Sequence, residues 1–124
     1  MAIKKNSKKD QKWIIGLVII CLIFGYFIFK DIERYQRIKT TQNNKQVEYS
    51  GVDGKTVFEL LKSSHDVEYT KSDLGVFIIS IDNLKTTDGN YWIYYVNDRM
   101  GEVAADKFLT ENGQKIIWKY EKLQ

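Results

Sequence analysis

The chain has 124 residues, one cysteine, no proline and a formal net charge of +3. Residues 1–29 carry five bases against one acid and residues 30–46 carry five against two, whereas residues 47–124 carry nine bases against thirteen acids. Because a nucleic-acid-binding domain concentrates its bases on the folded part, the acidic segment excludes nucleic acid as an expected partner, and the single cysteine excludes a disulfide framework.

Residues 13–29 form an apolar run without a charged residue. As a helix, these seventeen residues rise about 25 Å, at the short end of what crosses a hydrocarbon core of about 30 Å. Lys12 and Lys30 flank the run and can extend their side chains to the two interfaces. The run predicts a transmembrane helix, because a helix in the core of a soluble domain would show a polar face.

The basic tail, residues 1–12, predicts a cytoplasmic N-terminus and an extracytoplasmic C-terminal domain at the cell membrane, by the positive-inside rule. We favour an uncleaved signal anchor over a cleaved signal, because the segment after the run, FIFKDIERYQR, lacks the small residues that signal peptidase needs. A lipoprotein is the other alternative. It would use Cys21, but Ile20 stands before it where a small residue is expected.

Residues 30–46 form the predicted juxtamembrane segment. Ile32, Tyr35 and Ile38 recur every three residues, so the anchor helix is expected to continue for two or three turns. The polar sequence TTQNNKQ then predicts a flexible linker.

Residues 47–124 form the predicted folded domain. Its clearest element is a helix that begins after Thr56, where Glu59 completes a capping box. The only histidine, His65, falls at the end of this helix and is expected to cap it or lie on the surface. The remaining segments predict strands and turns: KQVEYS, DVEYTKS, a central strand LGVFIISID covered on both faces, the Asp88-Gly89 turn, YWIYYV, the turn NDRMG, a loop and strand from MGEVAA onward, the Asn112-Gly113 hairpin turn and KIIWKY.

One helix among about five or six strands indicates an α+β fold, with the helix on one face of a mixed or antiparallel sheet. Four motifs occur in order: Thr56-Val57 at the helix start, IDNL with Asn83 where glycine is usual, WIYYVND with Asp98 for glycine, and GQKIIWKY with Gln114 for an acid. Over about residues 47–122 they resemble an uncharacterised bacterial family related to the C-terminal domain of transcobalamin and intrinsic factor.

The resemblance implies a β-grasp-like fold, in which a sheet holds one helix across its face. Asn83 and Asp98 are expected to occupy left-handed turn positions, which asparagine and aspartate tolerate better than other non-glycine residues. No cobalamin-binding residue is carried over, because in the cobalamin carriers a separate helical domain holds most of the ligand.

No constellation for catalysis stands out in the sequence. It has no nucleophile elbow, no phosphate-binding glycine loop and no histidine pair, so we expect neither enzyme activity nor a cofactor or metal. Asp98, Glu102 and Asp106 are spaced by four but are expected to be solvated acids. The segment DNLKTTDGN lacks the alternating acids of a calcium loop.

The candidate ligand-binding residues are four aromatics in YWIYYV: Tyr91, Trp92, Tyr94 and Tyr95. On a strand, Tyr91 and Tyr95 point to one face and Trp92 and Tyr94 to the other. One pair must pack on the helix. The other pair either spans core and water, as tyrosines do, or forms a surface for a flat ligand, a glycan or a partner protein.

Two functions from different classes follow. The first is a membrane-anchored, extracytoplasmic, non-enzymatic binding module that crosses the membrane once and presents a small ligand or cofactor near a membrane transporter. The alternative is a structural or protein-interaction module of the cell envelope.

Overall fold

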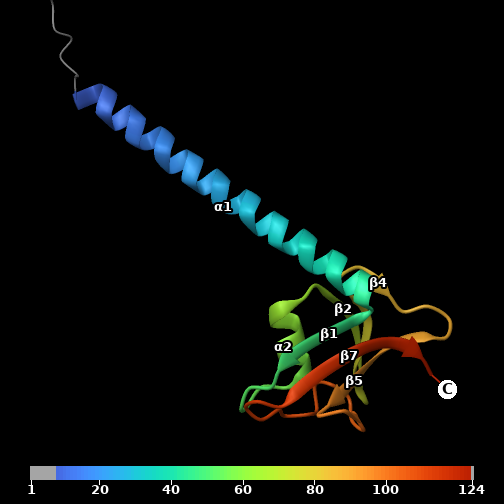
Figure 1. Ribbon diagram of the computed structural model, residues 1–124. Helices are drawn as coiled ribbons and strands as arrows, with labels where there is room; N and C mark the ends of the chain where they lie inside the picture. Colours follow the sequence, from blue (N-terminus) through green and yellow to red (C-terminus); the bar gives the residue numbers. More distant parts are fainter. Residues whose placement is uncertain (1–7, 124) are drawn as a thin grey trace, which may run out of the picture. The chain divides into compact units, whose positions relative to one another are not determined.

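The computed structural model describes residues 8–123, and the chain divides into two compact units, residues 1–36 and 37–124 (Figure 1). Residues 1–7 of the basic tail lie outside the described part. Helix α1 (Lys8–Asn44) supplies the described part of the first unit. Its apolar side chains are exposed, Trp13 by 75% and Leu22 by 69%. A helix this apolar and this long could span a membrane, which confirms the predicted apolar helix.

The last turns of α1 belong to the second unit. The linker prediction is wrong for residues 40–44, which continue the helix. A tertiary contact explains the difference, because Thr41 is buried and its hydroxyl donates to Asp82 at 2.7 Å. The helix ends at Asn44. The next residue, Lys45, has a φ of 52°, and its N–H donates to the Thr41 carbonyl at 2.8 Å.

The second unit has the predicted α+β fold, with seven strands in two antiparallel sheets in place of one sheet. The larger sheet has the order β1-β7-β5-β6, with β1 (Gln46–Ser50), β7 (Lys115–Lys122), β5 (Asn90–Val96) and β6 (Arg99–Met100). The smaller has the order β2-β3-β4, with β2 (Val67–Ser72), β3 (Gly75–Ile81) and β4 (Leu84–Lys85).

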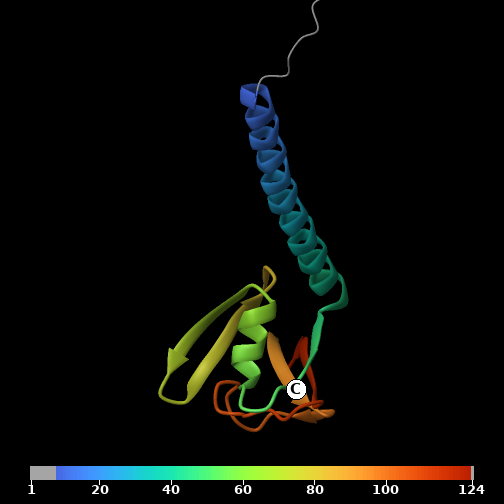
Figure 2. The ribbon, with the colours of Figure 1, turned by 90° about the vertical axis from the view of Figure 1, so that its left-hand side faces the viewer.

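Helix α2 (Val57–Ser64) begins as predicted. The Thr56 hydroxyl accepts from the Glu59 N–H at 3.1 Å, and the Glu59 carboxylate accepts from the Thr56 N–H at 3.0 Å. The helix lies between the two sheets (Figure 2). Phe58 meets Tyr69 of β2 edge to face at 4.7 Å, and the Val57 carbonyl accepts a hydrogen bond from the Tyr49 hydroxyl of β1. The core therefore lies around α2, between the sheets.

Strand β3 departs from its prediction. The sequence predicts a strand covered on both faces. Val76, Ile78 and Ile81 are buried in the core, but Phe77 is 50% exposed and Ile79 is half-buried. The single helix α2 covers one face of this strand. A continuous run of β-branched residues therefore does not by itself distinguish a strand covered on both faces from one covered on one face.

Two further turn and strand predictions are corrected. Residues 101–109 form a loop, joined to the helix start by the isolated bridge between Leu109 and Thr56. Gly113 does adopt the left-handed conformation, with φ of 84°, but no strand precedes it. Instead, the Thr110 hydroxyl bonds to Val52 and Lys55, which fixes this segment to the loop before α2.

The left-handed turn residues are confirmed. Asn83 has φ of 64° and Asp98 has φ of 67°. Each is the second residue of a two-residue turn whose first residue, Asp82 or Asn97, also has positive φ. These turns connect β3 to β4 and β5 to β6, the two tight hairpins around which the two candidate sites are built.

Candidate functional site

Strand β5 places its aromatic side chains on two faces with different surroundings. Trp92 and Tyr94 are each 6% exposed and belong to the core. The Trp92 indole donates to the Leu84 carbonyl at 2.8 Å, and the Tyr94 hydroxyl donates to the Val103 carbonyl. Both rings also border a groove of about 170 Å³ between β3 and β5, smaller than ordinary ligand pockets, which start at about 300 Å³. The structure thus makes these two candidate residues core residues.

Tyr91 and Tyr95 lie on the other, outer face and are half-buried. Tyr91 meets Phe77 of β3 edge to face at 6.4 Å. The Tyr95 hydroxyl donates to the Glu121 carboxylate, which raises the pKa of Tyr95, and the Lys119 ammonium lies 4.5 Å from the Tyr95 ring centre. These two tyrosines are thus on the partly open face, and the hydroxyl and ring of Tyr95 already interact with Glu121 and Lys119.

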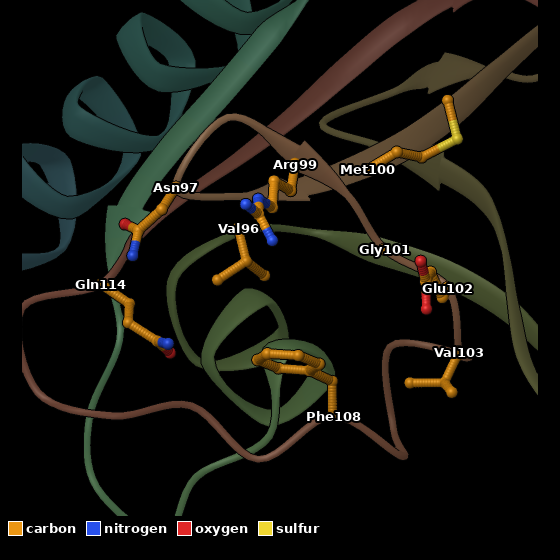
Figure 3. A pocket seen from close by; sticks show the side chains of 9 residues that line it. All are labelled: Val96, Asn97, Arg99, Met100, Gly101, Glu102, Val103, Phe108 and Gln114. Atoms are coloured by element: carbon orange, nitrogen blue, oxygen red, sulfur yellow. The ribbon is translucent and has the colours of Figure 1, made fainter.

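A cavity of about 530 Å³ lies at the Val96 end of β5, and we call it the distal pocket (Figure 3). The strand register sets its place. Val96 pairs with Ile116 and Ser50 pairs with Lys115, so the distal pocket lies at the end of the sheet away from Gln46, where the chain arrives from α1. The pocket is lined by Val96, Asn97, Arg99, Met100, Gly101, Glu102, Val103, Phe108 and Gln114.

The lining of the distal pocket combines apolar walls with a few polar groups. In Figure 3, Val96 and Phe108 face the centre from opposite sides, the Arg99 side chain reaches inward from β6, and the Gln114 amide enters from the segment before β7. Met100 and Val103 are about half exposed at its margin, 52% and 49%. Such a cavity can hold a ligand by apolar contact and orient it through the guanidinium and amide groups.

Tyr94 does not line the distal pocket but contacts two residues that do, Gly101 and Phe108. Gly101 lies so close to the Tyr94 ring that a Cβ on residue 101 would clash with it, at 2.1–2.6 Å from three ring atoms. The Tyr94 ring also contacts Phe108, with ring centres 6.4 Å apart. The aromatic strand therefore supports this site without exposing Trp92 or Tyr94. Sequence reasoning missed the pocket, whose only visible signals were the polar turn after the aromatic strand and the glycine that follows it.

A second group of polar side chains surrounds Asp82, and we call Arg37, Thr41, His65 and Asp82 the Asp82 cluster. Asp82 is fully buried. Its carboxylate accepts from Thr41 Oγ1 at 2.7 Å, from the Asp66 N–H at 3.0 Å and bonds to His65 Nδ1 at 2.6 Å. Arg37 Nε lies 3.9 Å from Asp82 Oδ1. His65 caps α2, as predicted, but its side chain is only 13% exposed, so it is not a surface residue.

The charge state of Asp82 follows from two opposing effects. Burial is the largest single effect and favours the neutral acid. The hydrogen bonds from His65, Thr41 and the Asp66 amide together outweigh it, so the pKa of Asp82 is lowered from its ordinary value. The cluster thus holds a buried carboxylate in its ionised form, directly between the end of α1 and the end of α2.

The other acidic side chains that the sequence analysis named do not gather at one site. Asp98 pairs with Lys115 at 3.0 Å, and the Asp106 carboxylate accepts from the Val76 N–H at 3.0 Å, so they stabilise different parts of the domain. Among residues 8–123, no group of three or more histidine, cysteine, aspartate or glutamate side chains is arranged to hold a metal ion.

A protein-family model described as "Domain of unknown function (DUF4430)" matches residues 54–122. The chain belongs to this family. The DUF4430 segment contains the whole distal pocket, together with His65 and Asp82, whereas Arg37 and Thr41 lie before it. No curated protein and no solved structure matches the chain.

Proposed function

We propose that the protein is a membrane-anchored, extracytoplasmic, non-enzymatic module that binds a small ligand in the distal pocket. The observation that carries the proposal is the cavity itself. Its volume of about 530 Å³ falls within the usual range for small-molecule sites, about 300–1,000 Å³, and its lining has the usual mixture of apolar walls and a few polar groups.

The anchor and its orientation are part of the proposal. The apolar segment of α1 supports a membrane span, and the excess of lysines before it favours a cytoplasmic N-terminus with residues 47–124 outside. An uncleaved α1 would keep the DUF4430 domain at the membrane. The ligand would then be held where a membrane transporter can receive it.

A non-enzymatic role fits the chemistry of the distal pocket. Its charged groups are Arg99 and Glu102. Glu102 is the one lining group that could act as a base, and the lining contains no serine, cysteine, lysine or histidine to act with it. The resemblance to the transcobalamin C-terminal domain adds a finer hypothesis, that the ligand is a cofactor such as a corrinoid. Binding measurements must establish that class independently.

The test is a ligand screen by thermal unfolding of the full-length chain in detergent, with corrinoids, other vitamins and cell-wall fragments. A ligand at one hundred times its Kd stabilises the folded state by about 2.7 kcal/mol, which raises Tm by several degrees. Val103→Trp should fill the pocket margin and abolish the shift. Leu109→Trp is the matched control, because Leu109 is 63% exposed on the same loop but does not line the pocket. A screen without any shift, or an equal shift in Val103→Trp, would contradict ligand binding at this site.

The alternative is a protein-interaction module, and the outer face of β3 and β5 is the observation in its favour. Phe77 is 50% exposed there, beside the half-buried Tyr91. A photo-crosslinking residue at position 77 would trap a reproducible envelope partner in intact cells under this alternative. The small-ligand proposal predicts no such partner but does predict the Val103→Trp effect, so the two experiments separate the functions.

A further inference from the structure

A second cavity of about 530 Å³ lies within the unit of residues 37–124, where the last turns of α1 meet the start of β1. We call it the polar pocket. It is separate from the distal pocket and shares no lining residue with it. The residues that line it are Arg37, Thr40, Thr41, Asn44, Gln46, Val47, Glu48 and His65.

Hydrogen-bond donors dominate the lining of the polar pocket. Arg37, Thr40 and Asn44 lie along α1 at spacings of three and four residues, which places them on one face of the helix. Arg37 Nε is a buried nitrogen without a hydrogen-bond partner among the described residues. The Asp82 carboxylate, 3.9 Å away, is too distant to accept a hydrogen bond from it. The Arg37 side chain as a whole is 39% exposed, so it is accessible to a ligand, and an acceptor in the polar pocket would satisfy the buried Nε.

His65 adds a second nitrogen whose orientation is fixed. Asp82 binds Nδ1 at 2.6 Å, so Nε2 is the ring nitrogen left for a ligand in the polar pocket. In the imidazolium form of a histidine both ring nitrogens donate, here Nδ1 to Asp82 and Nε2 to a ligand in the pocket. Glu48 is the one carboxylate in the lining, and it is exposed on β1.

We propose that the polar pocket binds a phosphate-type oxyanion through Arg37 and His65, with Thr40 and Asn44 as further donors. A carboxylate offers only two oxygen atoms, whereas a phosphate ester offers three strong acceptors for a donor set that comes from two helices. Arginine suits such a ligand because its planar guanidinium can bind two oxygens at once. This proposal is independent of any ligand in the distal pocket.

The phosphate can come from two sources. Arg37 follows Phe29, the last residue of the apolar run, by eight positions in the sequence, so a lipid headgroup of the membrane is one source. A free phosphate ester is the other. The same donors would bind either, and the membrane environment used in the experiment distinguishes them.

The test uses His65 as a reporter, because it is the only histidine in the chain. Its ring ¹H and ¹⁵N resonances are followed in the full-length protein in uncharged, phosphate-free detergent while inorganic phosphate is added. Chloride at equal ionic strength controls for screening. The proposal predicts a saturable shift with phosphate. It also predicts at least tenfold weaker binding in Arg37→Gln and unchanged binding in Arg99→Gln, which removes an arginine of the distal pocket.

A second experiment, in lipid bilayers, identifies the source of the phosphate. The protein is placed in nanodiscs of phosphatidylglycerol or of a phosphate-free glycolipid. A His65 shift with phosphatidylglycerol alone would support a headgroup ligand, and a saturable shift with phosphate in detergent would support a free ester. Near-UV circular dichroism checks the fold of Arg37→Gln, and Arg37→Lys, which keeps the charge but lacks Nε, replaces it if it does not fold. The absence of a shift in every arm, or the same shift after substitution of Arg37, would overturn the proposal.

Discussion

The two ends of the folded unit are built in different ways. At the end where α1 joins, a fully buried carboxylate holds α1 and α2 together through short hydrogen bonds to Thr41 and His65. At the other end, the β5–β6 turn and the loop of residues 101–109 surround a partly apolar cavity. The structure of the first end depends on a few directional hydrogen bonds, whereas that of the second depends on the shape of the cavity. Substitutions around Asp82 should therefore affect stability most, whereas substitutions at the second end should mainly affect ligand binding in the distal pocket.

Asp82→Ala should have the largest effect on stability. It leaves Thr41, His65 and the Asp66 N–H without their buried acceptor, at an expected cost of about 3 kcal/mol in the free energy of unfolding. Urea unfolding followed by near-UV circular dichroism measures it. Asp73→Ala, at an exposed turn, should cost less than about 0.5 kcal/mol. Equal costs for the two variants would show that the Asp82 cluster does not stabilise the domain.

Gly101→Ala tests the other end. The added Cβ would lie only 2.1–2.6 Å from three ring atoms of Tyr94, so the loop or the ring must move, at an expected cost of about 2 kcal/mol. The same change should weaken any ligand binding in the distal pocket. In a Tyr94→Leu background the cost should shrink, because the obstructing ring is gone. A cost that is unchanged in that background would mean that Gly101 matters for another reason.

The pH dependence of stability should also distinguish the two ends, with a smaller effect than the substitutions above. The folded-state pKa of Asp82 lies below its ordinary value, so its ionised form stabilises the fold at neutral pH, and this contribution is lost as the pH falls through the folded-state value. The stability difference between wild type and Asp82→Asn should therefore narrow between about pH 5 and pH 2. Gly101→Ala should show no such narrowing. A difference that stays constant over this range would argue against an ionised Asp82.

Local features of the fold could be predicted from the sequence. The capping box at Thr56 and Glu59 and the left-handed turns at Asn83 and Asp98 depend on neighbouring residues, and all four residues have the predicted roles. The alternation of β5 correctly separated Tyr91 and Tyr95 from Trp92 and Tyr94. It did not show which pair is buried, because that depends on which side of the strand α2 packs.

The candidate sites depend on contacts between distant residues. Thr41 and Asp82 are 41 positions apart, and the polar segment around Thr41 alone predicted a linker. The division into two sheets was equally hidden, because the residue pattern within a strand does not depend on whether β3 pairs with β5. The distal pocket forms because a loop without strand structure closes over Tyr94, and no periodic pattern predicts where such a loop lies.

The central claim is that the distal pocket lies outside the cell and binds a ligand, and one labelling experiment tests it most directly. Val103→Cys is introduced with Cys21→Ser, which removes the only native cysteine. Intact cells are then treated with a membrane-impermeant maleimide, with and without a ligand identified by the thermal screen. The account predicts labelling in intact cells that slows as the ligand saturates the pocket. Labelling only after lysis, or at a rate that saturating ligand leaves unchanged, would contradict it.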